Sequence, residues 1–209
     1  PPGETGIEPI VTASLHGTGG RITIGREFRP HAGDEVGLQD GSRMVSTTGD
    51  TALSLLAPAE GDRLRIRQES GSARFDIVPS VGGVVVETSL GNVRVWGTRF
   101  AVTIWPDPLH AEPGPVLLEV GVEEGSVEVR NGAGGILLEP GHTALVFPDA
   151  PPSRIVVRAR GRTWTEGIMR DLAMALDRSD GRGIARAVAM LRHQGRDGAL
   201  AVAERIAEG

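Results

Sequence analysis

Hydrophobic and polar residues alternate with a period of two in short segments between about residue 20 and residue 158. This period places successive side chains on opposite faces of an extended chain, so each segment predicts a half-buried β-strand. Gly, Pro, Asp or Asn residues, which are typical of turns, separate the segments. The predicted strands are Arg21–Ile24, Met44–Thr47, Ala52–Leu56, Arg63–Arg67, Ala73–Val78, Val84–Thr88, Asn92–Trp96, Thr98–Ile104, Val116–Val122, Ser126–Arg130, Ile136–Leu138, Thr143–Phe147 and Arg154–Arg158.

About a dozen short strands at spacings of roughly 8–12 residues, with no helical segment between them, are typical of antiparallel sandwiches, rolls and barrels. The turn residues agree with this architecture. Glu123-Glu124-Gly125 joins two alternating segments, and Asp40-Gly41 and Asn131-Gly132 are turn dipeptides. We therefore predict a mainly β protein with an antiparallel sandwich or roll over residues 20–160.

The hydrophobic pattern changes after Arg160 to spacings of three and four residues, which predict helices. Thr163-Trp164-Thr165-Glu166 has the form of a capping box, in which the Thr hydroxyl and the Glu carboxylate bind backbone N–H groups at the start of a helix. Two further apolar stripes begin at Ile184 and Leu200. The sequence thus predicts a C-terminal appendage of two to three helices over residues 161–209. Residues 1–19 are predicted to be an extended N-terminal segment with a terminal strand at Ile10–Leu15.

The composition changes this picture mainly by exclusion. Hydrophobic residues make up 39% and charged residues 23% of the chain, which is enough for a packed core. The formal net charge is −5, no Lys occurs, and only three Trp and four Phe are present, so nucleic acid is not an expected partner. The absence of Cys excludes disulfides and thiolate chemistry. No apolar run approaches the roughly 18 residues that cross a bilayer, so we expect no membrane span within this chain.

Candidate chemistry is sparse. The five His residues show no metal-ligand spacing, and we predict no catalytic residue, no cofactor and no metal site. Arg63, Arg65 and Arg67 alternate with apolar residues, so their guanidinium groups are expected on one strand face, either paired with carboxylates or binding an acidic sugar or a phosphate. Trp96 and Trp105 stand at strand ends, where an exposed indole often anchors a partner. These five residues are the candidate partner-binding residues.

The strongest alternation lies in Phe75–Ile104, where its phase is reset at Gly97. A Gly within a strand predicts a β-bulge or a close approach of a neighbouring backbone. Thr98 is β-branched, and we expect its hydroxyl to satisfy an amide at the bulge. The sequence therefore predicts a bent, tightly packed strand at the middle of the fold.

Several spaced elements of this region resemble the FecR domain family. They are Gly33-Asp34, Phe75-Asp76-Ile77, Val86-Glu87-Thr88, Gly91 through Val102, Val122 through Val129, and Leu138-Glu139-Pro140-Gly141, in this order. The resemblance covers about residues 33–147 and centres on the segment VWGTRFAV. It implies that the signature positions are structural framework residues, namely Gly91, Val93, Val95, Gly97, Thr98, Phe100, Val102 and Gly125.

The resemblance implies an all-β extracytoplasmic domain of a transmembrane regulator of the anti-sigma type, without catalytic residues. Members of this kind carry a cytoplasmic anti-sigma segment, one membrane helix and this domain. We therefore expect a non-enzymatic module for protein–protein interaction and signal sensing, in the periplasm or at the cell surface. Its expected partner is an envelope protein, and its expected tether is a segment not present in this chain. The helical tail does not resemble the small α/β module of transporter-coupled regulators, so iron transport is not implied.

Two alternatives stay open at this point. The first is a self-assembling structural protein of the cell envelope or of an extracellular filament, in which Ile10–Leu15 adds to the sheet edge of a neighbouring copy. The second is a carbohydrate-binding module that uses Arg63, Arg65, Arg67 and an exposed Trp.

Overall fold

The computed structural model describes residues 13–16, 21–106 and 115–155, together with residues 172, 174–178, 180, 183, 184 and 186–188. The chain divides into two compact units, one formed by residues 1–104 and 118–155 and the other by residues 105–117 and 156–209. The strands are β1 (Ala13–His16), β2 (Arg21–Ile22), β3 (Glu27–Phe28), β4 (Glu35–Leu38), β5 (Arg43–Ser46), β6 (Ala52–Leu56), β7 (Asp62–Asp76), β8 (Gly83–Thr88), β9 (Gly91–Val95), β10 (Arg99–Pro106), β11 (Pro115–Glu124), β12 (Val127–Asn131), β13 (Gly134–Leu138), β14 (Thr143–Val146) and β15 (Ser153–Ile155).

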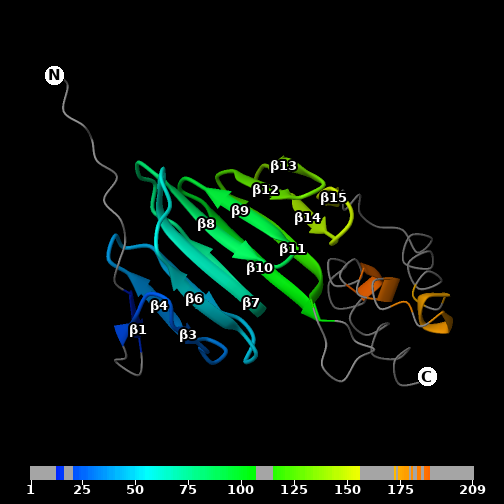
Figure 1. Ribbon diagram of the computed structural model, residues 1–209, viewed down its shortest axis with the longest axis horizontal. Helices are drawn as coiled ribbons and strands as arrows, with labels where there is room; N and C mark the ends of the chain where they lie inside the picture. The colour runs from blue at the N-terminus through cyan, green and yellow to red at the C-terminus, as the bar shows by residue number, and fades with distance from the viewer. Residues whose placement is uncertain are drawn as a thin grey trace. The chain divides into compact units, whose positions relative to one another are not determined.

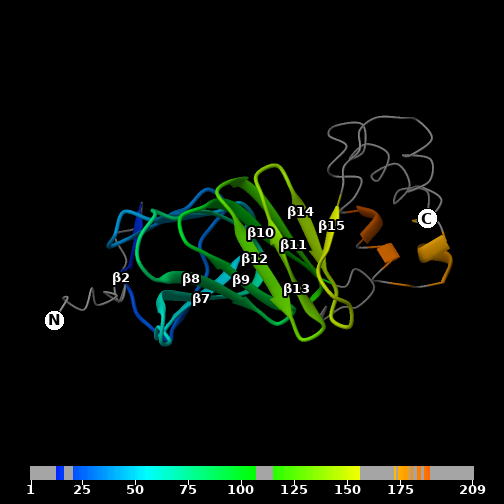
Figure 2. The same cartoon turned by 90° about the horizontal axis from the view of Figure 1, so that it is seen from above.

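These strands form a continuous, mainly antiparallel sheet. Its main path has the order β13-β12-β9-β8-β7-β10-β11-β14-β15, and the strands from β1 to β6 branch from β7 through β5 and β6. The N-terminal strands, drawn in blue, lie at one end of the first unit, and β13 to β15 lie toward the other end (Figure 1). The view turned by 90° keeps this separation (Figure 2). Among the strand pairs whose register is described, β7 and β8 alone are parallel.

Strand β7 pairs with two different groups of strands along its length. Its first part pairs with β6 and β8, and from Gly71 onward it pairs with β10 and then also with β5. Gly71 has a φ of +75°, and a Cβ atom there would lie 2.5 Å from the Cα atom of Thr51. Glycine satisfies both requirements, because it adopts positive φ and allows backbones to approach closely. One strand can therefore join two groups of strands around a common core.

The core takes side chains from both groups of strands. Phe75 of β7 and Phe100 of β10 are fully buried and stack with their ring centroids 4.9 Å apart. Alternation along β10 determines which side chains enter the core, because Phe100, Val102 and Ile104 are buried and the residues between them are partly exposed. Burial of one such side chain stabilises the folded state by roughly 1.5–3 kcal/mol.

The mainly β fold predicted from the sequence is confirmed, with differences in detail. The segments Arg63–Arg67 and Ala73–Val78, predicted as two strands, belong largely to the single strand β7. The alternation does not predict β3, which has two residues, or β4, whose Gly37 interrupts the pattern. The predicted strand Arg154–Arg158 corresponds to β15, and residues 156–158 lie outside the described residues.

The pairing of strand β1 tests the expectation that the N-terminal segment pairs with another copy of this chain. It overlaps the predicted strand Ile10–Leu15, of which residues 10–12 lie outside the described residues. β1 pairs with β2 and also with β4 of the same chain. Ala13 and Ser14 are therefore paired on both sides within this chain, whereas the described pairing of Leu15 and His16 is with β4 on one side.

The described part of the C-terminal unit contains two helical segments. Residues 172 and 174–177 belong to the first, and residues 183, 184 and 186–188 belong to the second. Their apolar faces pack through Leu172, Ala175, Ile184 and Ala187. The predicted capping box, the third apolar stripe and both predicted domain boundaries, at 19/20 and 160/161, lie outside the described residues. Neither of the two segments has the length and hydropathy that a helix needs to cross a bilayer.

Candidate partner-binding surface

The bend at Gly97 is the centre of the predicted signature. Gly97 has a φ of +130°, and a Cβ atom there would lie 2.7 Å from the Cα atom of Pro79. Two backbone hydrogen bonds hold this contact in place, since Ile77 N–H donates to the Thr98 carbonyl at 3.0 Å and Thr98 N–H donates to the Ile77 carbonyl at 3.1 Å. The close backbone approach expected from the sequence is therefore made with the connection between β7 and β8.

Thr98 and Gly125 join the next hairpin to this bend. The Thr98 hydroxyl donates to the Ser126 carbonyl at 3.0 Å, whereas the sequence predicts that it satisfies an amide. A Cβ atom at Gly125 would lie 2.7 Å from the Gly97 carbonyl oxygen. The turn between β11 and β12 thus packs directly on the backbone at Gly97.

The other signature residues lie inside the fold. Val93 and Val95 of β9 and Phe100 and Val102 of β10 are fully buried. At Gly91 a Cβ atom would lie 2.8 Å from the Arg130 carbonyl oxygen, so this residue allows β9 and β12 to approach. These side chains therefore lie in the core, and the glycines lie where neighbouring backbones approach closely.

Arg63 is buried, in contrast to its expected place on an open strand face. Its side chain is only 4% exposed and forms an ion pair with Asp40 in the turn between β4 and β5. Its Nη2 atom also donates to the Val78 carbonyl at 2.5 Å. This guanidinium therefore ties the start of β7 to the turn after β4 and to the chain that follows β7.

Arg65 and Arg67 lie on the outer face of β7 and are paired with carboxylates. Glu87 of β8 forms ion pairs with both of them, through Oε1 with Arg65 and through Oε2 with Arg67 at 3.5 Å. Arg67 also lies 3.8 Å from Glu69. The three arginines predicted as one set are therefore divided between a buried contact and a surface ion-pair cluster.

Trp96 borders a hollow on the outer face of β8, β9 and β12, which are neighbours in the sheet (Figure 1). Trp96 directly follows the last residue of β9 and is 48% exposed. The hollow has a volume of about 420 Å³ and is lined by Val85, Asn92, Arg94, Trp96, Glu128 and Arg130. We call these six residues the Trp96 hollow.

Of the six residues that line the Trp96 hollow, only Trp96 is predicted from the sequence to bind a partner. Register explains their proximity, because Arg94 lies between Val85 and Glu128, and Asn92 lies beside Arg130. Their alternation along β9 and β12 is the only signal that the sequence carries for this face. Trp105, the other indole predicted to bind a partner, lies near the end of β10 and is half-buried.

Exposed apolar side chains also occur in the connection between β7 and β8. Val78 and Val81 are 40% and 63% exposed. Val81 lies two residues before Gly83, and a Cβ atom on Gly83 would lie 3.6 Å from the indole Nε1 of Trp96. We call Val81 and Trp96 together the Val81–Trp96 edge.

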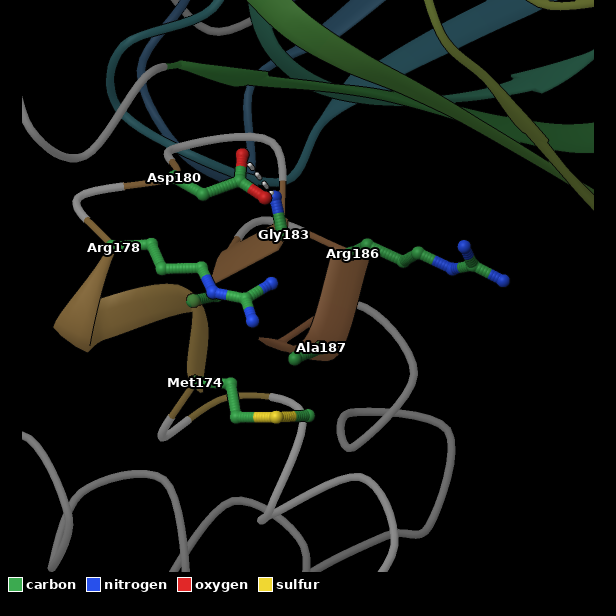
Figure 3. Close-up of a pocket in the computed structure, with 7 residues that line it drawn as sticks. Met174, Arg178, Asp180, Gly183, Arg186 and Ala187 are labelled. Carbon is green, nitrogen blue, oxygen red and sulfur yellow. Dashed lines mark hydrogen bonds between the residues drawn. The ribbon is translucent and has the colours of Figure 1, made fainter.

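The C-terminal unit has a hollow of its own, with a volume of about 290 Å³. It lies beside the turn between the two helical segments, where Asp180 Oδ1 accepts a hydrogen bond from Gly183 N–H at 3.1 Å (Figure 3). Ala187 and Met174 contribute apolar surface, and the Arg186 side chain extends away from the turn (Figure 3). Within the described parts of the chain, no group of three His, Asp or Glu residues is placed to hold a metal ion.

No protein-family model matches the sequence, and no curated protein matches it. Similarity is found to two crystal structures, at 1.65 and 2.50 Å resolution, of a putative anti-sigma factor from Parabacteroides distasonis ATCC 8503. Each superposes with a TM-score of 0.50 and 20% sequence identity over 70% of this chain. The chain spans 65% and 64% of the lengths of those two chains. At this level of identity, the comparison establishes a shared fold.

Proposed function

We propose that this chain is the extracytoplasmic, FecR-like module of a membrane-tethered regulator of the anti-sigma type. In this role it binds a partner protein in the cell envelope, receives a signal there and catalyses no reaction. The observation that carries the proposal is the fold shared, over 70% of the chain, with the putative anti-sigma factor from Parabacteroides distasonis. The FecR-like sequence elements support it, because the elements from Gly91 to Val102 and around Gly125 contain the residues that build the bend at Gly97.

The surface best suited to a protein partner is the Val81–Trp96 edge. Exposed indole and aliphatic groups gain the most when a partner removes them from water, and Trp is enriched among residues that dominate binding energy. Arg63 has no part in such a contact, because its guanidinium is buried against Asp40 and Val78. Arg65 and Arg67 would contribute to the rim of an interface, where paired charges add little affinity.

The test uses the full-length protein in the bacterium that encodes it. Transcript profiles are compared between wild type, a gene deletion, Val81→Asp and Leu137→Asp. Leu137 is the matched control, because it is an aliphatic residue, 55% exposed, that lies on β13. We expect the deletion to change transcription from one class of sigma-dependent promoters, and we expect Val81→Asp to reproduce that change while Leu137→Asp does not.

Two results would contradict the proposal. If the deletion leaves sigma-dependent transcription unchanged, the regulatory role is wrong. If the deletion has the expected effect but Val81→Asp behaves as wild type, the role stands and the assigned surface is wrong.

A cysteine-labelling assay on intact cells tests the extracytoplasmic location. Glu60 is exposed, so the single Cys of a Glu60→Cys variant should react with a membrane-impermeant maleimide. A Cys that reacts only after the cells are lysed would contradict this location.

A further inference from the structure

We propose that the Trp96 hollow is a binding site for an uncharged saccharide. The site goes beyond the proposed regulatory role and does not depend on it. Its volume of about 420 Å³ lies within the range of about 300–1,000 Å³ that is typical of small-molecule sites. Its lining combines an indole, an amide, two guanidinium groups and a carboxylate over an apolar floor.

The shape and the apolar surface of the hollow suit a sugar ring. Val85 is almost fully buried and forms the floor of the hollow, where it pairs with Arg94 of β9 on one side and with Arg65 of β7 on the other. Trp96 stands at the border with about half of its side chain exposed. An exposed indole offers a flat apolar face together with one N–H donor. A sugar ring presents C–H groups on its faces and hydroxyl groups at its edge, so it complements both features.

The hollow also contains hydrogen-bonding groups that are not used within the described residues. Among the described residues, neither the Asn92 amide nor the Trp96 indole N–H has a partner. Arg130 donates to Glu128 Oε1 through Nε and Nη2, at 3.3 and 2.8 Å. Its Nη1 atom and the Glu128 Oε2 atom therefore remain for a ligand. The hollow offers donors and acceptors side by side, which is what a hydroxyl group requires because it both donates and accepts.

The charged side chains of the hollow are paired within the chain. Arg94 Nη2 lies 3.0 Å from Asp62 Oδ1, in an ion-pair contact with a carboxylate that is only 4% exposed. An anionic ligand that drew Arg94 away would leave a buried carboxylate unpaired, which is strongly unfavourable. Arg130 is likewise paired, with Glu128. The charges of the hollow are thus balanced within the chain, and this balance favours a neutral polyhydroxylated ligand over an acidic one.

The saccharide proposal differs in its residues from the one based on sequence alone. The residues that line the hollow include Trp96 but none of Arg63, Arg65 and Arg67. The preference also changes from an acidic to an uncharged sugar, because the buried partner of Arg94 becomes visible only in the folded structure.

The test begins with the purified chain on a broad array of neutral and acidic glycans. Any neutral oligosaccharide that binds is then titrated by calorimetry and by tryptophan fluorescence. We expect Trp96→Ala to weaken binding by about tenfold or more and Asn92→Ala by about threefold to tenfold, as the loss of one or two neutral hydrogen bonds predicts. Trp96→Phe should retain part of the affinity, because it keeps an apolar ring and loses the N–H donor. Ser80→Ala, an exposed polar residue outside the hollow, is the matched control.

Three outcomes would overturn the proposal. They are the absence of any bound neutral glycan, binding that is equal in wild type, Trp96→Ala and Asn92→Ala, and binding confined to acidic glycans. Circular dichroism of each variant ensures that a loss of affinity does not reflect unfolding. Asn92→Ala separates the sugar site from the Val81–Trp96 edge. It should weaken sugar binding and leave the transcript profile of the cells as in wild type.

Discussion

Replacement of Gly97 by Ala tests the close packing and the backbone conformation at the bend. A Cβ atom at this position would lie 2.7 Å from Pro79 Cα and 2.8 Å from two further atoms of the same ring. Real Cβ atoms do not approach so closely, so the β7–β8 connection must move. Movement would stretch the paired hydrogen bonds between Ile77 and Thr98, which run beside the contact.

The magnitude follows from two contributions. A φ of +130° is strained for a residue with a side chain, at about 1–3 kcal/mol. Overpacking against a fixed backbone adds about 1–3 kcal/mol. We therefore expect Gly97→Ala to lower the free energy of unfolding by about 2–6 kcal/mol.

Two other glycines separate these contributions. Gly25 has a φ of +79° with nothing within 4 Å of its added Cβ, so Gly25→Ala should cost only the conformational strain, about 1 kcal/mol. Gly132 is free of both constraints, and Gly132→Ala should stay within about 1 kcal/mol of the wild type. Urea unfolding followed by circular dichroism measures all three variants, and the dependence on urea concentration should keep the same slope.

We expect the loss of unfolding free energy to be largest for Gly97→Ala, smaller for Gly25→Ala and smallest for Gly132→Ala. A loss for Gly97→Ala that equals the loss for Gly25→Ala would show that the contact with Pro79 yields easily. A Gly97→Ala variant as stable as Gly132→Ala would refute both the strain and the close approach at the bend.

Three further predictions concern the parts that surround the bend. Arg63→Met should lower the free energy of unfolding by about 2–4 kcal/mol, because Asp40 loses its ion pair and the Val78 carbonyl loses the guanidinium donor; a double-mutant cycle with Asp40→Asn should show strong coupling, and additive effects would contradict the contact. Thr98→Val should cost about 1–2 kcal/mol in urea unfolding through the lost bond to the Ser126 carbonyl, and Thr98→Ser should recover most of it. A fragment of residues 1–155 should unfold cooperatively when followed by circular dichroism, because its main core cluster lies wholly between residues 13 and 146; a broad, non-cooperative transition would show that residues 156–209 are needed.

Local pattern was sufficient to predict much of the β fold. The predicted and observed bounds of β6 agree, and the buried residues of β9 and β10 follow the predicted alternation. Pairing over long sequence distances was not predictable from pattern. The parallel pairing of β7 with β8 and the single course of β7 through Gly71 depend on contacts with Thr51 and with other strands, which no period in the sequence encodes.

The candidate surface was predictable only at isolated points. Trp96 could be predicted from the sequence, because an exposed indole at a strand end often anchors a partner. Arg63 could not be separated from Arg65, because the register irregularity between Asp62 and Leu64 is what interrupts the regular alternation near the start of β7. The Trp96 hollow depends on the lateral order of β8, β9 and β12, so its members become neighbours only after the sheet has formed.

The signature residues and the candidate binding residues therefore carry different kinds of information. Gly91 and Gly125 allow backbone contacts that join β9 to β12 and the β11–β12 turn to the bend at Gly97. Any protein that builds this bend needs small residues at such contacts, whatever it binds. Trp96 and Val81 make no comparable demand on the backbone, because their side chains extend into solvent. A resemblance in the signature thus indicates how the chain folds, and the identity of its partners depends on exposed positions that the fold leaves free to vary.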